Sequence, residues 1–299
     1  MIKATELTKN FDEYIALDKL NLQIDKGSLY GLVGTNGSGK STLLRLISGV
    51  YYPDGGTIEI DGAQVFENIP LKDRVFFLSD DLYFLPQCTM NDMAAFYRSV
   101  YSGWSDEKFK NYLLHLPLDP KKRISTFSKG MKRQAGLLFA LSCQPDVMLL
   151  DEAFDGLDPV VRGAFKKVIA EEMADREMTV LVSSHNLREL EDMCDHVGVL
   201  HKGKVMLDKE IDELKLGFCK VQAAFKPMVD PVKLEKLEIL QMDQTGSLLN
   251  LIIKGNRASV LSYLQTLDPI FCEAVPLTLE EVFIHEMEAI GYDYKNILL

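Results

Sequence analysis

Residues 34–42 read GTNGSGKST, and their types and spacing suit the binding of a triphosphate. The glycines of this run let the backbone turn tightly and point successive N–H groups inward, where phosphate oxygens can accept them. Lys40 can then neutralise the β- and γ-phosphates, and the Ser41 hydroxyl can ligate Mg²⁺. The run therefore predicts a phosphate-binding loop. Its candidate contact residues are Gly34, Asn36, Gly37, Gly39, Lys40, Ser41 and Thr42.

The segments on either side supply the elements that such a loop needs. Residues 29–33 (LYGLV) form an apolar run that predicts a buried strand, and residues 41–48 (STLLRLIS) predict an apolar helix closed by Gly49. A loop between a strand and a helix N-terminus places phosphate groups at the positive end of the helix dipole. The order of elements therefore agrees with the chemistry of the loop.

A second informative run, VMLLDEAFDGLDP, occupies positions 147–159. Its apolar residues predict a buried strand that ends at Asp151 and Glu152, at the sheet edge where ligands bind in open α/β folds. There Asp151 can hold Mg²⁺, and Glu152 can polarise the water molecule that attacks the γ-phosphate. Taken alone, the acidic pair fits a strand that leads into a helix N-terminus better. The phosphate-loop pattern upstream reverses that preference.

The remaining patterns predict an α/β core with a helical insertion. Short, fully apolar strands at residues 147–150 and 180–183 are typical of a covered parallel sheet, and a helix over residues 160–175 separates them. Before them, strand patterns cover residues 2–7, 20–24, 29–33, 57–60 and 75–78, and helical patterns cover residues 91–101, 106–114 and 129–141.

The chain changes character after about residue 212. Strand-like segments at residues 221–225, 247–254 and 271–274 are mixed with helix-like segments at residues 231–237 and 258–267. This set is sufficient for a small α+β domain of its own. The sequence therefore predicts one large domain followed by a small one.

Composition limits the classes of function. The 299 residues are 47% hydrophobic, which supports a sizeable core, and the net charge of −11 argues against a broad nucleic-acid-binding surface. The five cysteines form no C-x-x-C pair, so neither a disulfide framework nor a zinc site is indicated. Signal-peptide and membrane-spanning patterns are missing from the sequence. We therefore expect a protein of the reducing cytosol that reaches a membrane only through another molecule.

Five short motifs follow one another in a characteristic order. GTNGSGKST is followed by FSKGM (127–131), LLDE (149–152), DGLD (155–158) and His185. In this order they resemble the nucleotide-binding subunit of ABC transporters over residues 1 to about 210. FSKGM departs from the LSGGQ signature of that family, because Lys129 and Met131 replace a glycine and a glutamine. The segment LTLEEVF (277–283) is similar to the tail of prokaryotic exporters of drugs and antimicrobial peptides.

The resemblance implies an architecture and a set of partners. The fold is expected to be a P-loop NTPase core with antiparallel β and helical subdomains, over residues 1–211 with the helical part at about 82–141. A small α+β accessory domain would cover residues 212–299. Two ATPase subunits, identical or different, would close around two ATP with Mg²⁺ and drive a separately encoded membrane permease, in the direction of export. The protein would then lie at the inner face of the cell membrane, with no nucleic acid partner expected.

Two other interpretations share many of these motifs. A soluble ABC ATPase that acts on ribosomes or DNA is disfavoured, because such members usually carry two ATPase units or long coiled coils. An importer subunit would look the same through residue 210. Isolation of the native partner, a polytopic permease or a nucleic acid, would separate the first of these from a transport subunit.

The resemblance also assigns roles to single residues. Ser128 and Gly130 would contact the γ-phosphate of the ATP held by the other subunit, although Ser128 alone also fits an ordinary helix cap. His185 would hydrogen-bond the γ-phosphate. Phe11 would stack on adenine, with Tyr14 as the second choice.

One position departs from the family pattern. The strand over residues 75–78 usually leads to a glutamine that contacts Mg²⁺ and the attacking water, and here Asp80 takes that place. An acid can still bind Mg²⁺ through water, so Asp80 is a candidate metal contact. Its negative charge adds to that of the triphosphate, which changes the electrostatics of the site.

Overall fold

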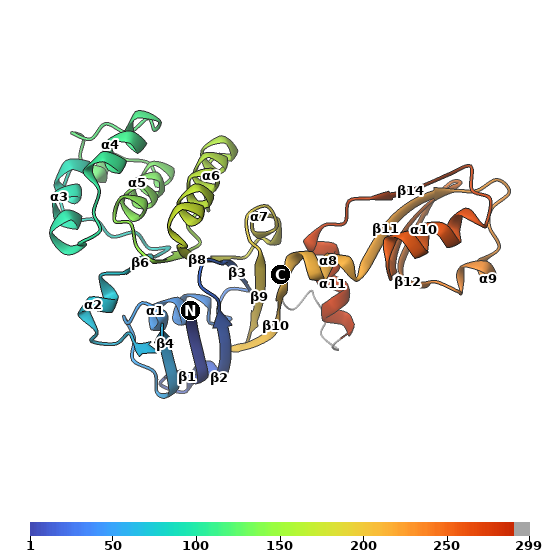
Figure 1. Cartoon of the computed structure of the whole chain (residues 1–299), viewed down its shortest axis with the longest axis horizontal. Helices are drawn as coiled ribbons and strands as arrows, with labels where there is room; N and C mark the ends of the chain where they lie inside the picture. The colour runs from blue at the N-terminus through green and yellow to red at the C-terminus, as the bar shows by residue number, and fades with distance from the viewer. Residues whose placement is uncertain (290–299) are drawn as a thin grey trace. The chain divides into compact units, whose positions relative to one another are not determined.

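The computed structural model describes residues 1–289, which form two compact units. The first unit comprises Met1–Asn186 and His196–Asp208, and the second comprises Leu187–Asp195 together with the chain from Lys209 onward (Figure 1). The second unit therefore includes a short piece of chain that lies within the sequence of the first. Within the described residues, no helix is long and apolar enough to cross a lipid bilayer.

A six-stranded sheet forms the centre of the first unit. Its strand order is β10-β9-β3-β8-β7-β6, and the pairs β3–β8, β3–β9, β7–β8 and β6–β7 are parallel. β3, β7 and β8 are buried at every residue, as their continuous apolar sequences require. The strands are β3 (Leu29–Val33), β6 (Val75–Leu78), β7 (Val147–Asp151), β8 (Thr179–Ser184), β9 (His196–His201) and β10 (Lys204–Glu210).

A second, antiparallel sheet packs against helix α1 (Lys40–Ile47). Its order is β2-β1-β4-β5, and one apolar cluster joins it to α1 and to the central sheet. Leu7, Leu43 and Leu44 are fully buried in this cluster. The strands are β1 (Ile2–Phe11), β2 (Tyr14–Ile24), β4 (Gly55–Ile60) and β5 (Ala63–Gln64), and α2 (Ile69–Lys72) follows them.

Helices α3 to α5 form the predicted insertion between β6 and β7 (Figure 1). Each begins at a side-chain cap, with Thr89 and Asp92 forming a capping box at α3, Ser105 capping α4 and Ser128 capping α5. α6 follows β7 and is capped by the Asp158 side chain. The helices are α3 (Met90–Val100), α4 (Asp106–Leu114), α5 (Lys129–Ser142) and α6 (Pro159–Arg176), with a 3₁₀ turn at Ile124–Thr126 before α5.

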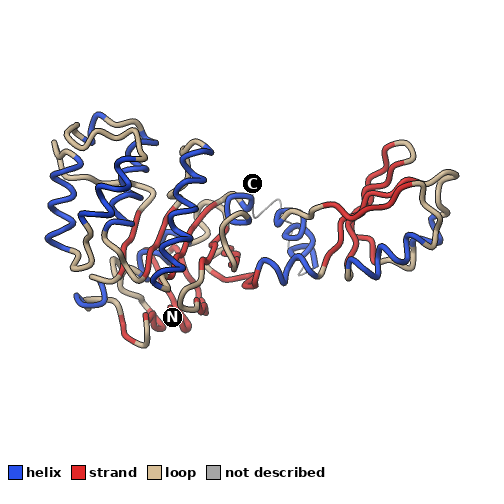
Figure 2. Tube along the Cα trace, turned by 45° about the horizontal axis from the view of Figure 1, so that its top comes forward, coloured by secondary structure: helices blue, strands red, loops and turns tan. Residues whose placement is uncertain are grey.

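The second unit is built on an antiparallel sheet with helices on one face (Figure 2). Its strand order, β12-β13-β11-β14, and its β-α-β-β-α-β sequence define a ferredoxin-like arrangement. Val221, Leu251 and Leu264 form the centre of its core. The elements are α7 (Leu187–Glu191), α8 (Ile211–Leu216), β11 (Phe218–Ala224), α9 (Pro231–Leu234), β12 (Glu238–Thr245), β13 (Leu248–Lys254), α10 (Arg257–Gln265), β14 (Phe271–Val275) and α11 (Leu279–Ala289).

Glu191 is one of the residues that join helix α7 to the second unit. Glu191 accepts a hydrogen bond from the backbone N–H of Leu279 at 3.0 Å and pairs with Lys215 Nζ at 2.6 Å. These contacts connect α7 to the start of α11 and to α8. The division in the structure therefore differs from a single cut at residue 211, because residues 187–195 pack with the C-terminal elements.

Candidate nucleotide-binding site

The loop between β3 and α1 has a backbone shape that only glycine accommodates at key positions. Gly39 is the N-cap of α1 with φ at 110°, and Gly37 has φ at 78°. A Cβ atom on Gly39 would lie 2.6 Å from the carbonyl oxygen of Ala16, and one on Gly34 would lie 2.3 Å from that of Leu200. The glycines are therefore required by packing as well as by conformation.

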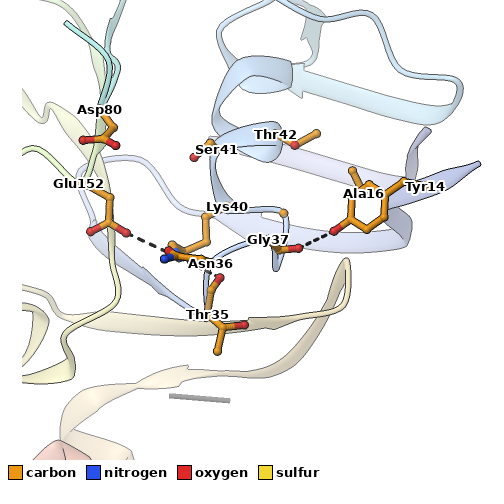
Figure 3. A pocket seen from close by; sticks show the side chains of 11 residues that line it. Tyr14, Ala16, Thr35, Asn36, Gly37, Lys40, Ser41, Thr42, Asp80 and Glu152 are labelled. Atoms are coloured by element: carbon orange, nitrogen blue, oxygen red, sulfur yellow. Dashed lines mark hydrogen bonds and ion pairs between the residues drawn. The ribbon is translucent and has the colours of Figure 1, made fainter. Parts of the chain in front are cut away.

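The loop forms one wall of a pocket of about 270 Å³ (Figure 3). Six of the seven loop residues predicted as phosphate contacts line it, and the seventh, Gly34, contributes its carbonyl oxygen to Lys40. Tyr14 and Asp80 complete the rim together with Glu152. The lining residues are Tyr14, Ala16, Thr35, Asn36, Gly37, Gly39, Lys40, Ser41, Thr42, Asp80 and Glu152.

Lys40 is a buried cation held over the loop. Its side chain is 5% exposed, and Nζ donates to the carbonyl oxygens of Gly34 and Thr35 and lies 3.6 Å from Glu152 Oε1. Burial lowers the pKa of the Lys40 ammonium, while the Glu152 and Asp151 carboxylates oppose that shift. A buried ammonium with carbonyl and carboxylate partners is suited to exchange them for phosphate oxygens.

Asp151 is the last residue of β7, and only one of its two carboxylate oxygens is hydrogen-bonded among the described residues. Oδ1 accepts a hydrogen bond from Ser183 Oγ at 2.6 Å, because Ser183 is its register partner on the parallel strand β8. Oδ2 is buried and has no hydrogen-bond partner among the described residues. An unsatisfied buried carboxylate oxygen beside a phosphate loop fits a divalent cation. Ser41 lines the pocket, whereas Asp151 lies next to the lining residue Glu152 and is not itself part of the lining.

Glu152 connects Lys40 to His185. It adopts a left-handed backbone conformation with φ at 48°, and its N–H donates to the carbonyl and hydroxyl oxygens of Ser183. Its Oε2 lies 2.9 Å from Nδ1 of His185, which is 61% exposed. Three residues predicted from separate motifs are thus brought together by the carboxyl ends of adjacent strands. The supporting role of Ser183 was missed, because nothing in the sequence shows which strands are neighbours.

Ser128 and Gly130 lie at the start of α5 and outside this pocket. Ser128 Oγ accepts from the N–H of Met131 at 3.2 Å, so the residue is an N-cap, and its side chain is exposed. A Cβ on Gly130 would approach the carbonyl oxygen of Gly156 to 3.2 Å. The γ-phosphate contact predicted for this pair is therefore not made with the pocket of their own chain.

Two predicted contacts have different surroundings from those expected. Phe11 does not line the pocket; its ring packs edge to face on Tyr51, with the centroids 5.4 Å apart. Tyr14, from the same β1–β2 hairpin, lines the pocket instead and donates to the Gly37 carbonyl oxygen at 2.6 Å. Asp80 lines the pocket, but its carboxylate is already paired with the Arg133 guanidinium, which competes with the predicted contact to Mg²⁺.

The fold and this site define an ATPase of the P-loop class. Residues 17–155 match the model of the ABC transporter family. The chain is 32% identical over 285 residues to the ABC transporter ATP-binding protein YtrB of Bacillus subtilis (strain 168), covering 95% of this chain and 97% of YtrB. It is also 32% identical to the bacitracin transport ATP-binding protein BcrA of Bacillus licheniformis, over 72% of this chain and 71% of BcrA.

Solved structures agree with this assignment. The structure of an ATP-binding subunit of an ABC transporter matches with a TM-score of 0.66 and 25% identity, over 72% of this chain and 92% of that one. The chain belongs to the ABC transporter family as an ATP-binding subunit. It is an ATPase whose hydrolysis of ATP drives transport, and the predicted α/β P-loop fold is confirmed.

Proposed function

We propose that two subunits, each this chain or a related ATPase, close around two ATP molecules. The observation that carries this proposal is the position of Ser128 and Gly130. Both lie at the start of a 14-residue helix, outside the pocket of their own chain, and Ser128 is exposed. Helix N-termini bind anions, so a second copy can supply the phosphate that this end of α5 recognises. Each site is then complete only in the pair.

Within each site, different residues have different roles in ATP hydrolysis. The loop amides and Lys40 bind the phosphates, and Ser41 and Asp151 would hold Mg²⁺, which neutralises charge on the β- and γ-phosphates. Glu152 accepts a proton from the attacking water, and the oxygen of that water bonds to the γ-phosphorus. The bond between the γ-phosphorus and the β-phosphate oxygen breaks at the same time, which releases ADP and phosphate. His185 contacts Glu152 through Nδ1 and would hydrogen-bond the γ-phosphate. Phe11 and Tyr14, on the hairpin beside the loop, stay the two candidates for stacking on adenine, and Tyr14 is the one that lines the pocket.

The transport partner is proposed to be an integral-membrane permease that binds the helical subdomain. Tyr83 is 75% exposed and Leu85 is 41% exposed in the segment that leads from the pocket to α3. The nearby aromatic residues are used internally, since Phe84 packs on Phe139 and Trp104 stacks on Tyr97. Exposed apolar side chains beside a nucleotide pocket suit a short cytoplasmic helix of a permease. This contact would hold the protein at the inner face of the membrane.

We further propose export of an antimicrobial peptide or drug. Support comes from the likeness to BcrA, a bacitracin transport protein, and from the LTLEEVF segment. Affinity purification of the tagged chain from native membranes, with mass spectrometry of what it retains, tests the proposal. We expect one polytopic membrane protein in stoichiometric amount, and ATP-driven efflux from cells that express both. Retention of ribosomes or nucleic acid, or ATP-driven uptake, would contradict it.

A further inference from the structure

Helix α5 presents two cations to the wall of the nucleotide pocket. Lys129 and Arg133 are four residues apart and share one face of the helix. Lys129 Nζ lies 3.1 Å from Asp155 Oδ2, and the Arg133 guanidinium donates to Asp80 Oδ1. Asp155 follows strand β7, and Asp80 follows strand β6, which pairs with β7 in parallel. Two ion pairs therefore tie the helix that begins at Ser128 to the sheet edge where the pocket lies.

The two ion pairs differ in burial, and the more buried pair is the one expected to contribute to the stability of the fold. Lys129 is 71% exposed, and an exposed pair contributes little to stability. Arg133 is 1% exposed, and within residues 1–289 its Nε and Nη1 have no hydrogen-bond partner. Asp80 is the carboxylate that its guanidinium contacts, and the charge of Arg133 also helps Lys129 to lower the pKa of Asp155. Removing the carboxylate that pairs with a buried cation strongly destabilises the folded protein. The Asp80–Arg133 pair is therefore the one expected to contribute to holding α5 in place.

Asp80 belongs to the pocket as well as to this anchor. Its side chain is 57% exposed, and it lines the pocket on the same side as Glu152 (Figure 3). Close packing keeps α5 near this wall, because a Cβ on Gly136 of α5 would lie 2.7 Å from Leu78 Cδ1 at the end of β6. The Asp80 carboxylate is therefore in contact both with the nucleotide pocket and with helix α5, which begins after Ser128.

We propose that Asp80 is a positioning residue, which fixes helix α5 through Arg133, and that it is not a ligand of Mg²⁺. An Asp80 turned toward a metal ion would leave a buried guanidinium without its carboxylate, and this cost opposes the metal contact. By holding α5, Asp80 sets where Ser128 presents the helix N-terminus to a second subunit. This last consequence rests on the function proposed above, whereas the anchoring of α5 does not.

Hydrogen exchange of the nucleotide-free protein tests the anchor directly. Asp80→Asn removes the charge at constant size, and we expect the amides of α5 to exchange about tenfold faster. Asp80→Glu keeps the charge and is expected to restore most of the protection. Lys129→Gln, which breaks the exposed pair on the same helix face, serves as the control and should change exchange by less than about twofold. Unchanged α5 exchange in Asp80→Asn would overturn the anchor.

A double-mutant cycle checks that Arg133 is the partner. Asp80→Asn and Arg133→Met should each lower the melting temperature. The double variant should lose clearly less than the sum of the two, because it removes both charges together. Additive losses would mean that the two residues stabilise the fold independently, which contradicts the proposal.

The metal question is settled by nucleotide binding. With a fluorescent ATP analogue titrated at increasing Mg²⁺, Asp80→Asn should need the same Mg²⁺ concentration as the unaltered protein, within about twofold. In the hydrolysis-deficient Glu152→Gln background, ATP-dependent association of Asp80→Asn should weaken about tenfold while monomer affinity for ATP is kept. A Mg²⁺ requirement that rises tenfold would make Asp80 a metal ligand. If the Glu152→Gln parent itself does not associate, the dimer proposal fails, and the exchange experiment still decides the anchor.

Discussion

At the scale of single residues, Lys40 is the charge on which the pocket depends. Its ammonium is buried among the loop carbonyls and Glu152, where the low dielectric strengthens any contact with phosphate. We expect Lys40→Ala to abolish ATP hydrolysis and to weaken ATP binding by about 30-fold or more, the equivalent of ~2 kcal/mol. Steady-state ATPase assays and nucleotide titration measure both effects. Lys26→Ala, which removes an exposed lysine paired with Glu177, is the control and should change neither; normal activity in Lys40→Ala would refute the site.

His185 and Ser128 are expected to affect turnover more than nucleotide binding by the monomer. His185 contacts Glu152, and Ser128 lies outside the pocket of its own chain. His185→Ala and Ser128→Arg should therefore lower the ATPase rate by on the order of 10²-fold while the monomer affinity for ATP changes by less than about threefold. Single-site binding measured beside ATPase activity separates the two effects. His115→Ala, on the exposed end of α4, is the control, and full activity of either altered site residue would contradict its role.

The phosphate loop was predictable from sequence, but its supporting residues were not. Glycines at positions 34 and 39 are required by close approach of backbone atoms, so their spacing reports the local shape directly. Ser183 and Arg133 act through neighbours 32 and 53 positions away in the chain, Asp151 and Asp80 respectively. No local sequence pattern shows that residues so far apart in the chain are in contact. Predictions from sequence were therefore strongest where chemistry is local and missed the residues that act across strands.

At the scale of elements, α4 and α6 are joined by one buried carboxylate. Glu172 of α6 is 6% exposed and accepts hydrogen bonds from Lys108 Nζ, from Tyr112 Oη at 2.9 Å and from Arg176 Nε at 2.9 Å. Burial alone raises the pKa of the Glu172 carboxyl, but the hydrogen bonds from Lys108 and Tyr112 and the charges of Lys108 and Arg176 together lower it below its ordinary value. The ionised form is thus favoured by the folded state.

This pKa direction fixes the sign of a pH effect. Because the folded pKa is lower than the unfolded one, the stabilisation is fully present above about pH 4.5 and is lost as the pH falls through the folded pKa. Glu172→Gln should cost about 1–3 kcal/mol at pH 7, with the difference narrowing below pH 4.5. Urea unfolding followed by the fluorescence of Trp104, the single tryptophan, measures this. Glu171→Gln, at a 61% exposed position, is the control; a pH-independent cost would contradict the assignment.

The elements followed the sequence in part, since strands β9, β10 and β12 formed where no strand was predicted. The strand predicted at residues 75–78 and the helix predicted at 106–114 form as β6 and α4 with the same bounds. The short helix α7 follows β8 in the chain, yet it packs with the C-terminal elements through Glu191. Periodicity shows which residues are apolar and not which unit buries them. The end of the first domain was therefore the least predictable boundary.

At the scale of the whole molecule, the proposed function requires association that depends on ATP. Glu152→Gln keeps the size of the side chain and its hydrogen-bonding capacity, but removes the negative charge that favours proton loss from water. Hydrolysis should fall by about 10²–10⁴-fold while ATP binding survives. Since each ATP would lie between the phosphate loop of one subunit and Ser128 of the other, unhydrolysed ATP stabilises only the associated state, by about 2.7 kcal/mol per site at 100 times its Kd.

The Glu152→Gln protein should therefore elute from size-exclusion chromatography as a dimer with saturating ATP and as a monomer without nucleotide. The unaltered protein should be mostly monomeric and slow, because its permease is absent. Adding Lys40→Ala to Glu152→Gln removes ATP binding, so the doubly altered protein should stay monomeric under both conditions. A Glu152→Gln protein that remains monomeric at saturating ATP would rule out the shared site. A nucleotide-free protein that is already a tight dimer would instead place assembly in the ferredoxin-like unit, whose edge strands β12 and β14 each pair on one side only within the described chain.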